Sequence, residues 1–291
     1  MKSYLELTKT NIVIFVLLSA MSGYALSFPL SSNFQLLHFL GFLFGLYLVS
    51  TGSFALNQTQ EWKQDAVMDR TKNRPIPSGK LQPWQAWLIG SGFITIGSIL
   101  LYFIEPLSAY LGLVTVFMYN CLYTLFWKRY WTFGAVPGAI PGAMPAVIGY
   151  SVHTSNLLTS ECVYLFLIMF LWQMPHFWCL AIRYKEDYRK GGFPVLSTKL
   201  GLNKTLFYIG LYVFVYAGVA LVSPWFLKTH VLYVFLVIPC ALKVIWEFFK
   251  YYHQETKGGW VRFFLWVNFS LLIFISVPVL DRLFMSIVTG P

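Results

Sequence analysis

The sequence is short of charged residues, and that shortage excludes most soluble proteins. Charged side chains make up only 11% of the 291 residues, and hydrophobic residues make up 57%. Soluble proteins have about 25% charged residues. The mean hydropathy is correspondingly high, at +0.63. We therefore predict a single integral membrane domain over residues 1–291, all-α and polytopic.

Cysteine and acidic residues are scarce as well. The cysteines lie in apolar segments without CxxC or Cys/His spacing, so we predict buried apolar thiols and no disulfide framework for Cys121, Cys162, Cys179 and Cys240. The 11 acidic residues are outnumbered by 21 basic ones, which gives a formal charge of +10. The bases are scattered over the connections between apolar runs, and nothing resembles a nucleic-acid-binding motif, so we predict no nucleic-acid partner.

Nine apolar segments are each close to the roughly 20 residues that cross about 30 Å of hydrocarbon. We predict spanning helices at about 11–29, 35–56, 84–104, 107–126, 132–151, 160–182, 205–222, 231–250 and 261–281. The first segment is long and lacks a clear small-residue cleavage site, so we do not expect a cleavable signal peptide.

Basic residues gather on one side of this arrangement. All but three of the 21 lysines and arginines fall in the N-terminal segment or in the inner connections, Lys2 and Lys257 among them. The exceptions are Lys228 and Arg282 outside and Lys243 within a span. This bias predicts a cytoplasmic N-terminus, cytoplasmic inner loops and an outer C-terminus.

Two inner connections, 57–83 and 183–204, are long, and function tends to lie in long loops on a rigid scaffold. The first begins with oxygen-bearing residues in steps of four, which on a helix drift by only about 40° per step and form one stripe: Asn57, Glu61, Asp65 and Asp69. Arg70, Lys72 and Arg74 follow at once. Carboxylates beside bases suit a magnesium-bridged diphosphate. A solvated loop with i,i+4 charge pairs and a positive-inside anchor explains the same spacing.

The second long connection continues from a helix that contains an intramembrane histidine. His176, Arg183 and Asp187 are spaced i, i+7 and i+11, so on a continuous helix the latter two lie within about 20° of the His176 direction. Ionisable groups at that depth are functional by default, and we interpret His176 as a ligand to a cofactor or iron. A structural histidine bonded between helices is the alternative.

Tyr123, Lys128 and Arg129 end the fourth span on the same inner side. The next span is rich in glycine and proline, at Gly138, Pro141, Gly142, Pro145 and Gly149. Such a helix is tolerated where it lines a cavity, and close helix packing also explains the glycines.

Several motifs together resemble one family. They are NxxxExxxDxxMDRTKNRP from Asn57, Tyr123-Thr124 with Lys128-Arg129, GAMPAVIGY from Gly142, PHFWCLAIRYKEDYRKGGFPVL from Pro175, and LTKTNIVIFVLLSAMSGY near the N-terminus. In these motifs the chain is similar to the protoheme IX farnesyltransferase (heme O synthase) family, a branch of the UbiA-type intramembrane prenyltransferases. The chain departs from the family pattern at Glu61, where aspartate is usual, and at Lys63, a position that is commonly acidic.

The resemblance implies helices around a central cavity, in a bacterial cytoplasmic (inner) membrane and in contact with lipid. It implies farnesyl transfer from farnesyl diphosphate to a vinyl group of heme b, with Mg²⁺ as cofactor and heme A synthase or terminal oxidase assembly downstream. The implied metal ligands are Asn57, Glu61, Asp65, Glu186 and Asp187, and Tyr123 joins Asn57, Glu61, Asp65 and Asp187 as a catalytic residue. The implied substrate-binding residues are Arg70, Lys72, Arg74, Lys128, Arg129, Arg183, Lys185 and His176.

Two other functions compete with heme farnesylation. One is prenylation of an aromatic quinone precursor by the same UbiA-type chemistry. The other is transport, but a transporter would carry ionisable groups near the midplane, whereas the acidic residues here gather mostly at one face.

Overall fold

The structure is a computed structural model that describes residues 6–253 and 259–289 of the chain. Lys2 and Lys257 lie outside the described residues. All regular secondary structure in the described part is helical, as predicted. The long helices are α2 (Thr10–Ser27), α3 (Leu36–Val67), α4 (Pro83–Ile104), α5 (Pro106–Phe117), α7 (Ala135–Tyr150), α8 (Ser160–Arg183), α11 (Gly201–Val222), α12 (Val231–His253) and α13 (Gly259–Thr289). Shorter pieces are η1 (Met118–Trp127), α6 (Lys128–Tyr130), α9 (Lys185–Lys190), α10 (Leu196–Lys199) and η2 (Ser223–Trp225).

Eight segments of the described chain are long and apolar enough to cross a membrane, one of them formed by α5, η1 and α6 together. The ninth predicted span is α7, which has only 16 residues. Residues 145–150, at the end of α7, are all buried, so neighbouring helices and not lipid surround that end. The prediction of about nine transmembrane helices is therefore approximately confirmed: eight segments of the described chain are long enough to span, and α7 is a shorter apolar helix.

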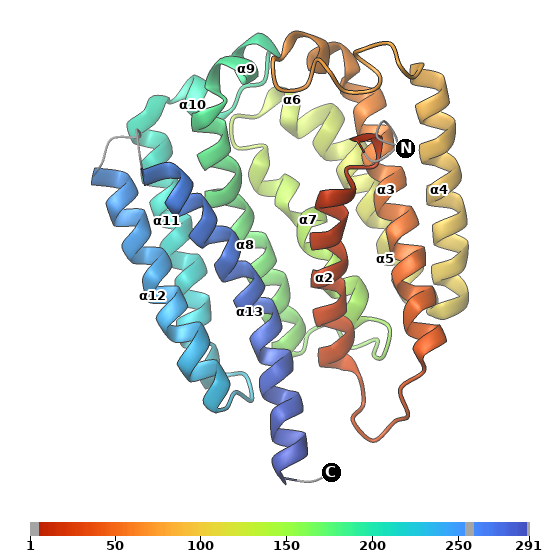
Figure 1. The fold of residues 1–291 in the computed structure, drawn as a ribbon, viewed down its shortest axis with the longest axis vertical. Helices are drawn as coiled ribbons and strands as arrows, with labels where there is room; N and C mark the ends of the chain where they lie inside the picture. The colour runs from red at the N-terminus through yellow and green to blue at the C-terminus, as the bar shows by residue number, and fades with distance from the viewer. Residues whose placement is uncertain (1–5, 254–258, 290–291) are drawn as a thin grey trace.

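The helices run side by side, and the connections at one end carry most of the basic motifs. Figure 1 shows α6, α9, α10 and the segment after α3 at the same end as the N-terminus, with the C-terminus at the other end. We call the end with α9 the inner end. Large apolar side chains such as Leu37, Phe103 and Phe235 are exposed on the outside of the bundle, where lipid would cover them.

α3 extends well past the predicted end of its span. It has 32 residues and ends at Val67, so part of the expected loop 57–83 is helix. Asn57, Glu61 and Asp65 are buried on its last turns, whereas Asp69 lies beyond the helix and is exposed. The predicted stripe is therefore correct for three residues and wrong for Asp69, because the chain turns at Met68.

Small residues bring α2 and α7 into backbone contact. A Cβ added at Gly149 would collide with the carbonyl oxygen of Ala20, and one added at Gly23 would collide with that of Ala146. Close packing is therefore one role of the glycines in α7. The prediction of buried cysteines holds for Cys162, Cys179 and Cys240 and is wrong for the exposed Cys121.

Candidate active site

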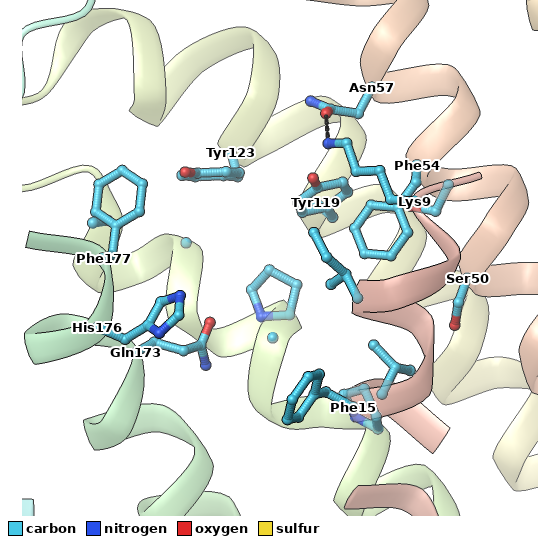
Figure 2. A pocket seen from close by; sticks show the side chains of 18 of the residues that line it. Lys9, Phe15, Ser50, Phe54, Asn57, Tyr119, Tyr123, Gln173, His176 and Phe177 are labelled. Carbon is cyan, nitrogen blue, oxygen red and sulfur yellow. Dashed lines mark hydrogen bonds between the residues drawn. The ribbon is translucent and has the colours of Figure 1, made fainter. Parts of the chain in front are cut away.

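A cavity of about 560 Å³ lies between α2, α3, α5, η1, α7, α8 and α13. Its inner end is polar: Figure 2 shows Lys9 bonded to Asn57, with the rings of Tyr119 and Tyr123 nearby. Its deeper part is lined by mostly uncharged side chains, including Phe15 and His176. One compartment thus joins a charged inner end, which we call the mouth, to an apolar interior.

Each oxygen ligand predicted on α3 contacts a basic side chain. Lys128 Nζ lies 2.6 and 2.7 Å from the two carboxylate oxygens of Glu61. Arg74 Nη1 lies 2.6 Å from Asp65 Oδ2. Both carboxylates are almost completely buried, at 3% and 2% side-chain exposure, and the predicted bases neutralise them. Buried charges of this kind require partners.

The side-chain oxygen of Asn57 also faces a base. Lys9 Nζ donates to Asn57 Oδ1 at 2.9 Å, and Asn57 Nδ2 donates to Thr124 Oγ1 at 3.1 Å. The Thr124 hydroxyl itself donates to the carbonyl of Tyr119, five residues earlier, which fits the π-helical geometry of η1. Because the Thr124 hydroxyl donates its proton to that carbonyl, its oxygen can only accept from the Asn57 amide nitrogen. The Asn57 Oδ1 atom therefore faces the cavity.

Lys9 was not predicted from the sequence as a site residue. It precedes α2 in a left-handed conformation with φ of 48° and lines the cavity. Burial, and then the positive charge of Arg74, lower the pKa of Lys9 from 10.5 to about 7. The only sequence signal for this residue was its place in the LTKTN motif.

The second acidic motif holds the segment after α3. Asp187 accepts the backbone N–H groups of Asp69 and Arg70 at 3.0 and 3.3 Å. Lys190 pairs with Asp69 at 2.6 Å, and this bond together with Lys72 holds the pKa of Asp69 at about 2. The ion pair of Lys190 and Asp69, which joins α9 to the segment after α3, thus stays ionised at neutral pH.

The expected single face from His176 to Asp187 does not exist. α8 ends at Arg183, and Tyr184, with φ of −107° and ψ of 30°, separates it from α9. Asp187 therefore points to the segment after α3, while the Arg183 guanidinium lies 5.6 Å from the Trp260 ring centre, away from the cavity. The spacing argument failed because it assumed an unbroken helix.

The structure separates the predicted site residues into two groups. Those that line the cavity are Asn57, Glu61, Asp65, Arg70, Arg74, Tyr123, Lys128 and His176. The others lie away from its lining: Lys72, Arg129, Arg183, Lys185, Glu186 and Asp187. Of these, Lys72 pairs with Asp69, Arg129 donates to the Gln60 carbonyl, and Glu186 pairs with Arg189 in solvent.

Among the described residues that line the cavity, the carboxylates that could hold a magnesium ion lie on α3. In the described ranges no group of three or more histidine, cysteine or acidic side chains is gathered closely enough to hold a metal. The amide oxygen of Asn57 and the carboxylates of Glu61 and Asp65 are oxygen donors of the kind that Mg²⁺ prefers. The donor chemistry therefore fits, with basic side chains beside each donor.

Four bases and two carboxylates line the cavity, so its mouth carries excess positive charge that suits an anion. The bases are Lys9, Arg70, Arg74 and Lys128. Arg70 also lies over the rings of Tyr184 and Tyr188, at 5.0 and 5.3 Å from their centres. These rings restrict where its guanidinium can point.

The deep part of the cavity holds a fixed imidazole. His176 lies between the rings of Trp172 and Phe264, and its Nδ1 is 2.8 Å from Asn268 Oδ1. On the facing helix α7, the two cavity glycines leave room for side chains: a Cβ at Gly138 would enter the Tyr123 ring, and one at Gly142 would collide with Gln173. The glycines of α7 therefore serve the cavity as well as helix packing.

Sequence reasoning also missed Tyr119, Gln173 and Asn268, which line the cavity. Tyr119 precedes Tyr123 by four residues, and Gln173 precedes the quoted PHFW motif, so spacing to known motifs was a usable signal for both. Asn268 lies in an apolar helix far from any motif and gave no signal.

The chain matches a known protein family and is similar to several of its members. The sequence pattern of the UbiA prenyltransferase family matches residues 16–269. A protoheme IX farnesyltransferase from Bdellovibrio bacteriovorus is 50% identical over 282 residues, which cover 97% of this chain and 97% of that protein. A protoheme IX farnesyltransferase from Leptospira biflexa is 36% identical and covers 84% of this chain and 86% of its own length.

Solved structures share the fold at low sequence identity. A digeranylgeranylglyceryl phosphate synthase superposes with a TM-score of 0.77 at 18% identity, over 96% of this chain and 97% of that one. A UbiA homolog from Archaeoglobus fulgidus bound to GPP and Mg²⁺ gives 0.66 at 15% identity, over 95% and 99%. These similarities show the helical architecture.

Proposed function

The chain belongs to the UbiA prenyltransferase family and is a prenyltransferase, and from that premise we propose that it transfers the farnesyl group of farnesyl diphosphate to a vinyl group of heme b. The observation that carries the proposal is one cavity with two unlike ends. Oxygen donors and bases lie at its mouth, and the imidazole of His176 lies in its apolar depth. The diphosphate group of farnesyl diphosphate needs the charged mouth, and its apolar tail and the heme need the apolar depth.

The mouth is the proposed diphosphate site. Asn57, Glu61 and Asp65 would hold Mg²⁺, which when bound shields the phosphate charge. Their present partners, Lys9, Lys128 and Arg74, are side chains that can turn to the phosphate oxygens once the carboxylates have another cation. These bases stabilise the negative charge that grows on the leaving group.

The reaction breaks the bond between farnesyl C1 and oxygen, and both electrons leave with the diphosphate. The vinyl π electrons of heme b form the new carbon–carbon bond to the allylic cation. Water then adds to the cation on the porphyrin side chain and loses one proton, which gives the hydroxyethylfarnesyl group of heme O. Tyr119 and Tyr123 line the cavity near its mouth, and their rings would stabilise the allylic cation there.

Apolar side chains keep bulk water from the cation, which water would otherwise quench. Phe15, Phe54 and Phe177 are among the apolar side chains that line the cavity, Phe15 in its deeper part. His176 lies seven residues, about 10 Å by helix rise, from Arg183 at the inner end of α8. That depth supports a role for His176 at the flat acceptor and away from the diphosphate.

We place the protein in a bacterial inner membrane with its inner end in the cytoplasm, where farnesyl diphosphate is soluble. The support is the gathering of lysine and arginine in the connections at that end. An enzyme that oxidises heme O, or an oxidase that binds it, would use the product.

Product mass tests the proposal directly. The full chain in lipid nanodiscs receives heme b, farnesyl diphosphate and Mg²⁺, and products are read by mass spectrometry with diphosphate release measured in parallel. We expect heme that has gained one farnesyl group and one hydroxyl group. A parallel sample receives a hydroxybenzoate in place of heme. Prenylation of the hydroxybenzoate with unchanged heme would overturn the proposal in favour of quinone-precursor chemistry.

A further inference from the structure

We propose that Asn268 is a positioning residue for the acceptor: it holds His176 in the tautomer that carries its proton on Nδ1, so that Nε2 presents a lone pair to the heme iron. This inference rests on the proposed function, since it takes heme b as the acceptor. The two residues are on different helices, α8 and α13, and are 92 positions apart in the chain.

The orientation of the Asn268 amide follows from its second bond. Asn268 Nδ2 lies 2.6 Å from the carbonyl oxygen of Phe264, one turn earlier on α13. A carbonyl oxygen only accepts, so the amide nitrogen must face it, and the opposite rotamer would bring two oxygens together. Asn268 Oδ1 is therefore the atom that faces His176, at 2.8 Å from Nδ1.

That orientation decides the histidine tautomer. An amide oxygen has no proton to give, so the bond forms only when His176 Nδ1 carries the proton. In a neutral imidazole the other nitrogen then has the free lone pair. Within the described chain Nε2 has no hydrogen-bond partner, His176 lines the cavity, and Figure 2 shows its ring turned toward the cavity beside Gln173.

The ring is also held in direction. Trp172 and Phe264 lie on either side, with ring centres at 4.6 and 4.9 Å and interplanar angles of 37° and 34°. α13 thus contributes twice, through the Phe264 ring and through the Asn268 amide one turn later. A histidine whose second nitrogen donates to an oxygen while the first faces open space has the arrangement of a metal-binding histidine.

Asn268 is a neutral hydrogen-bond partner for His176, and this suits a heme iron that must leave with the product. A carboxylate on Nδ1–H would make the imidazole more basic and strengthen its bond to iron, as in permanent metal sites. An amide oxygen orients the ring with little added basicity. Heme enters as substrate and leaves as product, so a weaker bond to iron favours turnover.

Heme titration of the full chain in nanodiscs tests this inference. Asn268→Leu keeps the approximate volume and removes the acceptor, so we expect heme b affinity about 10- to 100-fold weaker and a Soret band shifted as in His176→Ala. Asn268→Asp puts a carboxylate on the imidazole, so we expect the midpoint potential of bound heme to fall and product release to slow. Phe264→Leu separates ring packing from the hydrogen bond, because it removes a flanking ring and keeps the Asn268 bond, so we expect a smaller loss of heme affinity than in Asn268→Leu.

Affinity and Soret position in Asn268→Leu equal to those of the wild type would overturn the inference. If that variant fails to fold, Asn268→Asp decides, because an unchanged midpoint potential in it would also overturn the inference. The proposed function fails separately, when the wild-type protein makes no farnesylated heme. Wild-type farnesylation with an unaffected Asn268→Leu spectrum would overturn only the role of Asn268.

Discussion

The two acidic motifs at the inner end contain the same kind of side chain in different surroundings. Glu61 and Asp65 lie on a continuous helix, are almost completely buried, and contact lysine and arginine side chains inside the cavity. Asp187 lies on a one-turn helix after a break in the chain and accepts two backbone N–H groups, while its neighbour Glu186 is 62% exposed.

The difference shows that the partner of a carboxylate decides whether that carboxylate can exchange it for another ligand. A lysine or arginine side chain can swing away, so in the proposed function the first motif would exchange its bases for a metal ion. Backbone N–H groups are fixed by the fold, so Asp187 holds the segment after α3 in place while it accepts from them. The first motif is therefore built for exchange, and the second holds the segment that carries Arg70 and Arg74.

The largest expected effect comes from the first motif. Asp65→Ala removes a proposed metal ligand and leaves Arg74 without its buried partner, so we expect turnover to fall at least about 10³-fold, or about 4 kcal/mol. Farnesyl transfer at saturating Mg²⁺ measures this, and an unchanged Soret band with added heme controls for folding. Turnover near the wild-type level would remove Asp65 from the metal site.

Arg74→Met should have the next largest effect. In the proposed function Arg74 would bind the diphosphate in the ground state and the growing negative charge on it more strongly in the transition state, so we expect both a higher KM for farnesyl diphosphate and a lower kcat, with kcat/KM about 10- to 100-fold lower. Lys72→Met is the matched control, because Lys72 is exposed and pairs with Asp69 away from the cavity. Equal losses in both variants would show that general positive charge, and not the position of Arg74, matters.

Asp187→Asn should have an intermediate effect. The variant loses one acceptor for the N–H groups of Asp69 and Arg70, which costs about 1–3 kcal/mol of local stability. We expect kcat/KM to fall about 10-fold with no change in the Mg²⁺ concentration that gives half-maximal activity. If that concentration rises as for a changed first-motif ligand, Asp187 binds metal, as the family resemblance implied.

Glu186→Gln should have the smallest effect. Its one ion pair within the described residues is with Arg189 in solvent, and surface pairs of this kind contribute little. We expect kcat and KM for farnesyl diphosphate within about twofold of the wild type. A loss comparable to that of Asp65→Ala would mean that the inner loop rearranges to bring Glu186 into the cavity.

Local patterns in the sequence determined most of the architecture. Apolar runs of about 20 residues predicted the spans because only helices of that length cross hydrocarbon with their backbone satisfied. The four-residue step put Asn57, Glu61 and Asp65 on one face, since α3 does continue through them. Repeat spacing on an unbroken helix needs no knowledge of the rest of the fold.

Tertiary structure alone decided which side chains meet across helices. The break at Tyr184 turned Asp187 away from His176, and Lys9 reached Asn57 from another segment. Asn268 sits in an apolar run, where its spacing says nothing of a histidine 92 residues earlier. Such contacts depend on how α2, α3, α8 and α13 pack, and packing is set by the sum of many weak side-chain contacts that no short motif contains.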